Sequence, residues 1–87
     1  MQYTTFNSAN TVIRSERAVV HGFAIRATVA AVVHIHDNAT GAGIPVFKIS
    51  APTTDTVFYD SYKGIPFNNG IYIEIVSGTA TGSIFWE

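Results

Sequence analysis

The sequence predicts an all-β protein, a small antiparallel β-sandwich of the immunoglobulin-like or jelly-roll-like kind. Three observations support this. Apolar and polar residues alternate over most segments, which is the period of a strand with one face on a core. Turn-forming residues separate these segments at intervals of about 8–12 residues, as in sandwiches and barrels. No stretch shows the 3.6-residue period of a long helix.

The first residues are less clearly patterned than the rest. Residues 1–16 are polar and rich in Thr, Asn and Ser, so we expect an N-terminal arm or an edge strand. Residues 17–87 are expected to form one sandwich domain. Its first strand has Phe23, Ile25, Ala27 and Val29 on one face, and Gly22 indicates a bulge or bend.

The middle of the chain predicts three more strands. The first has one face apolar and carries His34 and His36 on the other, and the loop at 37–43 ends it. Residues 44–50 form the next strand, and Pro45 places its start on an edge, because proline cannot donate to a ladder. After a turn at 51–55, residues 56–62 form the third strand.

The last third of the chain, residues 63–87, predicts turn, strand, turn, strand. Its first strand alternates through three isoleucines, Ile71, Ile73 and Ile75. Asn-Gly at 69–70 and Ser-Gly at 77–78 are turn dipeptides. The closing aromatic run is expected to be an outer strand that also meets another molecule.

The composition favours a protein whose surface is partly covered by other molecules. At 87 residues the chain is one small domain of thin stability margin, and it has no cysteine to cross-link it. Charged residues are 13%, against about 25% in a typical soluble domain, and the net charge is −1. We therefore expect part of the surface to be covered by other copies or by a partner.

Several partners and locations are disfavoured. The five basic residues are scattered, which argues against nucleic acid. The longest apolar run is too short to span a membrane, and no signal-peptide pattern is present. We expect a soluble product made in the cytoplasm, or one released by lysis.

No motif for catalysis or phosphate binding is present, so we expect a protein that is not an enzyme. His34 and His36 point to one side of a strand, a spacing that metal ions use. A third ligand is not evident at a matching offset. We therefore expect no cofactor and no metal, with these two histidines as the only candidates.

The aromatic residues indicate an interface. Alternation cannot turn both Phe58 and Tyr59 inward, nor both Phe85 and Trp86, so one of each pair faces outward or meets a neighbour. Packing under the protein's own loops and stacking on sugars are alternatives. The residues predicted at the interface are Tyr59, Tyr62, Tyr72, Phe85 and Trp86.

A series of short features follows in a fixed order along residues 18–87. These are Val20-His21-Gly22-Phe23, His36-Asp37-Asn38, Ser50-Ala51-Pro52, the run from Gly64 to Tyr72, the turn at 77–80, and Phe85-Trp86-Glu87. In the order of these features, the chain resembles a class of small β-sandwich virion proteins of tailed bacteriophages.

The resemblance implies a structural role in the virion after synthesis in the host cytoplasm as a late protein. Such proteins are capsid decoration (cement) or other head- or tail-associated subunits. They self-associate, often as trimers, and dock to the major capsid protein or to other virion proteins. The alternative is a small module that binds glycans or a receptor through the same aromatic residues.

Overall fold

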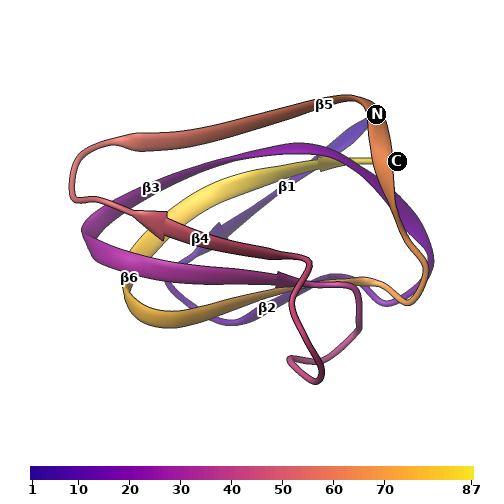
Figure 1. Ribbon diagram of the computed structural model, residues 1–87, viewed down its shortest axis with the longest axis horizontal. Coiled ribbons are helices and arrows are strands. Elements are labelled where there is room, and N and C mark those ends of the chain that lie inside the picture. Colours follow the sequence, from indigo (N-terminus) through magenta and orange to yellow (C-terminus); the bar gives the residue numbers. More distant parts are fainter.

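The computed structural model describes residues 1–87 and confirms the all-β class (Figure 1). All of its strands pair antiparallel, and no helix is present that could cross a membrane. The six strands are β1 (Gln2–Asn7), β2 (Thr11–Arg14), β3 (Ala18–His36), β4 (Phe47–Ala51), β5 (Thr56–Phe67) and β6 (Ile71–Trp86).

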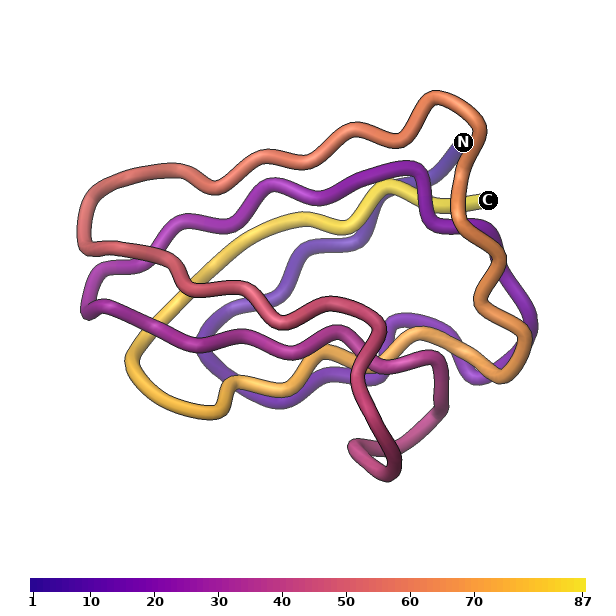
Figure 2. Tube along the Cα trace, viewed as in Figure 1, coloured from indigo at the N-terminus to yellow at the C-terminus, as the bar shows by residue number.

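The molecule is a sandwich whose two sheets share their central strands. The long strands β3 and β6 pair with each other, bend at the same end of the molecule, and continue into the other layer (Figure 2). The first sheet has the order β1-β6-β3-β5, and the second has the order β2-β6-β3-β4. Six strands are fewer than the seven of an immunoglobulin constant domain or the eight of a jelly roll.

The bend contains a glycine at a point where the two long strands approach closely. Gly78 has φ +77°, a conformation that side chains disfavour, and a Cβ there would overlap the carbonyl oxygen of Ala30. The pairing register of β3 with β6 shifts between Ala27 and Val33, as expected where strands bulge. The predicted turn at residues 77–78 is therefore wrong, because β6 bends there and continues.

Gly22 forms the predicted bulge. The register of β3 shifts between Val20 and Gly22 against both neighbouring strands. The extra residue turns His21 away from the core, and its Nε2 lies 3.0 Å from Glu87 Oε1. Phe23 then points inward, with 3% of its surface exposed.

The core lies between the sheets and follows the predicted alternation. Every second residue of β3 is buried on each side of its bend, and Ile71 and Ile73 of β6 meet them from the neighbouring strand. Val29, whose parity also predicted burial, is 57% exposed because it lies in the bend. Complete burial of one such aliphatic or aromatic side chain contributes about 1.5–3 kcal/mol.

The last strand is central. β6 lies between β3 on one side and β1 and β2 on the other, so the expectation of an outer strand is wrong. Residues 2–7 and 11–14 are edge strands, and Phe6 lies in the core with 4% exposed. Gln2 pairs with Trp86, which brings the two ends of the chain side by side (Figure 1).

Candidate interaction surface

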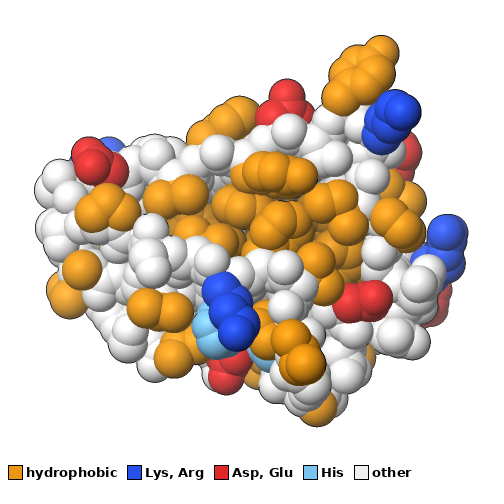
Figure 3. Space-filling view, viewed as in Figure 1, with side chains coloured by type: hydrophobic (Ala, Val, Ile, Leu, Met, Phe, Trp, Pro, Cys, Tyr) orange, Lys and Arg blue, Asp and Glu red, His pale blue; other side chains and the backbone are white.

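The sandwich is open along the side formed by β4 and β5. No strand pairs with the outer edge of either one, and the inner face of the core shows between them. Viewed from this side, apolar side chains gather over the region between β5 and β4 (Figure 3). An exposed apolar patch is informative in a soluble protein, because isolated exposed side chains are common but grouped ones are not.

Three aromatic rings from three strands pack together on this open side, where Phe23 is buried and Tyr59 is the exposed ring. Phe23 of β3 stacks on Tyr59 of β5 with ring centroids 5.4 Å apart, and Phe47 of β4 lies 5.2 Å from Phe23 and 5.3 Å from Tyr59. Tyr59 points inward yet keeps 36% of its surface exposed. Together with Val57, these residues are called the β4–β5 surface below.

More exposed apolar side chains flank the β4–β5 surface on the same two chain segments. Phe58 is 66% exposed and Tyr62 is 96% exposed, both on β5. Ile44 and Val46, just before β4, are 88% and 45% exposed. The free edge of β5 also leaves backbone groups open to pairing with another chain.

The predicted interface residues fall into three groups. Tyr59 and Tyr62 are on the open side, while Tyr72 and Phe85 are half-buried on the outer faces of β6. Trp86 is 7% exposed and lies inside the protein, so it is not available to a partner. Its position follows from the central place of β6.

Trp86 is held by the edge strands of the N-terminal segment. Its indole N–H donates to Thr4 Oγ1 at 3.1 Å, and the Arg14 guanidinium lies 5.3 Å from the ring centroid. An indole ring with a hydrogen-bonded N–H and a cation over its face is well satisfied in this position.

The two predicted histidines lie on β3 in the second sheet, with Glu74 of β6 directly opposite His34. Glu74 Oε1 is 3.5 Å from His34 Nδ1 and 2.9 Å from His36 Nε2. The hydrogen bond from His36 holds the pKa of the Glu74 carboxyl below its usual range, although burial opposes this and the charges of both histidines assist it. Glu74 was missed in the sequence because its partnership depends on strand register, which alternation does not give.

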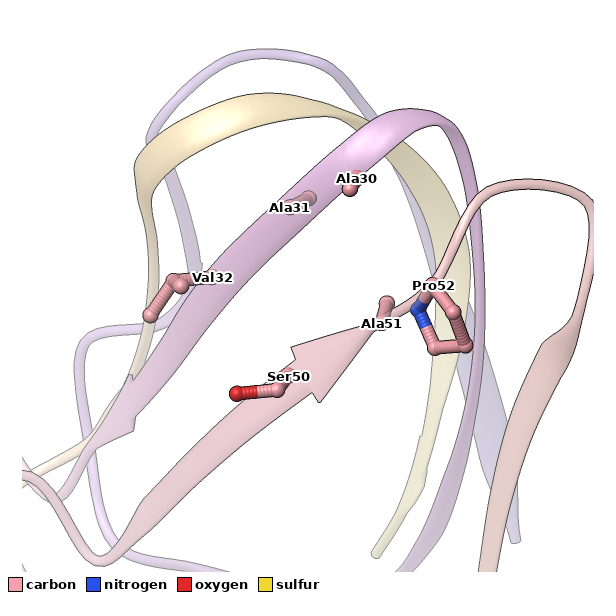
Figure 4. Close-up of a pocket in the computed structure, with 6 residues that line it drawn as sticks. All are labelled: Ala30, Ala31, Val32, Ser50, Ala51 and Pro52. Carbon is pink, nitrogen blue, oxygen red and sulfur yellow. The ribbon is translucent and has the colours of Figure 1, made fainter.

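An open apolar depression lies at the bend, between β3 and the end of β4 (Figure 4). Among the side chains that line it, only that of Ser50 carries an oxygen, and none is titratable. This lining provides neither a nucleophile with a base nor a ligand set for a cofactor.

Comparisons with known protein families, with curated proteins and with solved structures find no match to this chain.

Proposed function

We propose that this chain is a structural subunit without enzymatic activity, which self-associates through the β4–β5 surface. We further propose that it serves in the virion of a tailed bacteriophage, as a capsid decoration protein or another head- or tail-associated subunit. The observation that carries the first part is the aromatic cluster of Phe23, Phe47 and Tyr59, in which the Tyr59 ring stays exposed beside the free edge of β5. The virion role rests on the resemblance of residues 18–87.

A second copy of the same chain is the partner that these features favour. A net charge of −1 gives little repulsion between copies. The free edge of β5 provides the backbone groups for strand addition, and the rings provide apolar area beside it. Tyrosine and phenylalanine supply much of the binding energy in protein interfaces.

The test of self-association is a sedimentation-velocity series over protein concentration. The wild-type chain is expected to form a defined oligomer, with a trimer favoured by the resemblance. Tyr59→Lys places a charge at the contact and is expected to shift the chain to monomers. Val76→Lys is the matched control, since Val76 is 50% exposed but lies near the bend of β6.

A monomer at every concentration would overturn self-association, as would an oligomer that Val76→Lys disrupts equally. Circular dichroism of each variant shows whether the sheet content is retained. The virion role has a separate test in the genes that flank the coding sequence. Neighbouring genes for a major capsid, portal or tail protein are expected, and a purely metabolic neighbourhood would count against this role.

Glycan or receptor binding is the alternative function. It depends on exposed aromatic rings that stack on sugars, and Tyr62 is the most exposed ring in the chain. Trp86, the other ring on which this alternative depended, is buried. Saturable sugar binding that Tyr62→Ala removes would favour this alternative over self-association.

A further inference from the structure

The second sheet brings together three side chains that have the chemistry of a metal site. His34 and His36 alternate on β3 and therefore lie on the same face, and Glu74 on β6 is the cross-strand neighbour of His34. One ligand atom from each residue lies within 4.8 Å of the others. Two imidazoles with one carboxylate are a common zinc ligand set, with a fourth position left for water.

We propose that His34, His36 and Glu74 bind one divalent transition-metal ion, with Zn²⁺ as the best fit. The ligand atoms would be His34 Nδ1, His36 Nε2 and a Glu74 carboxylate oxygen. Around a tetrahedral zinc ion, ligand atoms lie about 3.4 Å apart. The separations of 3.5 Å and 2.9 Å from Glu74 Oε1 lie on either side of this distance, and the two histidine ligand atoms lie within 4.8 Å of each other.

The burial of the three residues differs in a way that suits such a site. The His36 side chain is 3% exposed, so it provides a fixed ligand from within the protein. The side chains of His34 and Glu74 are 22% and 33% exposed, which leaves a route for the ion and a place for a water ligand. A cluster closed on one side and open on the other matches a three-ligand zinc site.

One feature of His36 limits the metal affinity that we expect. Its Nδ1 is buried and has no hydrogen-bond partner. When Nε2 binds the metal ion, the ring proton is on Nδ1, which has no hydrogen-bond acceptor. Absence of such an acceptor typically weakens metal affinity by about 10–100-fold.

Three further charged or titratable groups lie near the cluster. Lys48 of β4 pairs with His34 in register and is exposed, so its ammonium can extend into solvent. The Tyr72 ring packs edge-on to His36 with centroids 6.1 Å apart. Asp37 Oδ1 accepts a hydrogen bond from the Asn69 backbone N–H, so this carboxylate has its partner outside the cluster. One carboxylate with two imidazoles favours zinc, nickel or copper over magnesium or calcium.

The test is isothermal titration of the chelator-treated full-length chain with ZnCl₂. Saturable binding of one ion per chain is expected. Glu74→Gln and His34→Gln each remove a ligand at a partly exposed position. Each is expected to weaken zinc binding by at least about 100-fold, which exceeds the typical effect of removing a residue that only hydrogen-bonds to a ligand. Titration with Co²⁺ is expected to give the strong visible absorption of a four- or five-coordinate ion.

The chain contains a matched control. His21 and Glu87 form another histidine–glutamate pair at 3.0 Å, but no second histidine joins them. His21→Gln is therefore expected to leave zinc affinity unchanged. Absence of saturable binding, or binding that survives both ligand substitutions, would overturn the proposal and leave the cluster as an ion-pair network.

A direct measurement covers the case of a variant that does not fold. Nitrogen-15 NMR of the wild-type imidazoles is expected to show shifts at His34 and His36, and none at His21, on adding zinc. Equal shifts at all three histidines would contradict a specific site. The ligands all come from one chain and lie outside the β4–β5 surface, so the stoichiometry per chain is independent of the outcome of the self-association test.

Discussion

Gly78 allows β6 to bend from one sheet into the other, and replacing it tests how tightly the two long strands pack. Alanine at φ +77° costs about 1–2 kcal/mol in backbone strain. Alanine also lowers the conformational entropy of the unfolded chain, which offsets about 0.4–1 kcal/mol of this cost. The overlap of the new methyl group with the Ala30 carbonyl adds about 1–3 kcal/mol, because backbone must move.

Gly78→Ala is therefore expected to lower the free energy of unfolding by about 2–4 kcal/mol. A chain of 87 residues has about 4–13 kcal/mol in total. At about 4–8 °C per kcal/mol, the expected fall in Tm is about 10–25 °C, measured by circular dichroism.

Gly43→Ala is the matched control. Gly43 has φ +81°, but a Cβ there meets nothing within 4 Å. Only the backbone strain remains, so the expected loss is about 0.5–1 kcal/mol. Equal falls in Tm for Gly78→Ala and Gly43→Ala would refute the close approach of β3 and β6 at the bend.

Three further predictions concern individual side chains. Phe67→Ala removes a fully buried ring and is expected to cost about 3–5 kcal/mol in urea unfolding, whereas Tyr62→Ala is expected to stay within about 0.5 kcal/mol; similar costs would contradict the burial. Trp86→Phe loses the hydrogen bond to Thr4 and is expected to cost about 1 kcal/mol, a loss that a Thr4→Val background should largely abolish. In metal-free protein the Glu74 carboxyl is expected to titrate below the usual pKa of 4.5 by carbon-13 NMR. Its contribution to stability is then complete above pH 4.5 and lost as the pH falls through the lower folded pKa, and a measured pKa at or above 4.5 would contradict the bond to His36.

The sequence correctly predicted the structural features that depend only on residues close together in the chain. The inward parity of β3 on both sides of its bend and of Ile71 and Ile73 was correct, as were the loop after His36 and the turn at Gly70. These features follow from the two-residue period and from turn chemistry, which are both encoded within a few positions.

Features that depend on pairing between distant strands were not predictable in this way. Ser77 and Gly78 look the same in sequence whether the chain reverses or bends within a continuous strand. The burial of Trp86 depends on β1 and β2 lying beside it, and the position of Glu74 opposite His34 depends on register. Alternation fixes which face a residue takes, but not which strand lies next to it.

The shared central strands have a consequence for how fast the chain reaches its native state. The β3–β6 ladder joins Val20 to Trp86 at one end and His36 to Tyr72 at the other, so a long loop must close before any of it forms. Each layer lacks its centre until its own part of this ladder exists, and both parts close long loops. We expect a single slow phase in the millisecond-to-second range, without a populated half-sandwich, and a transition state organised around β3 and β6.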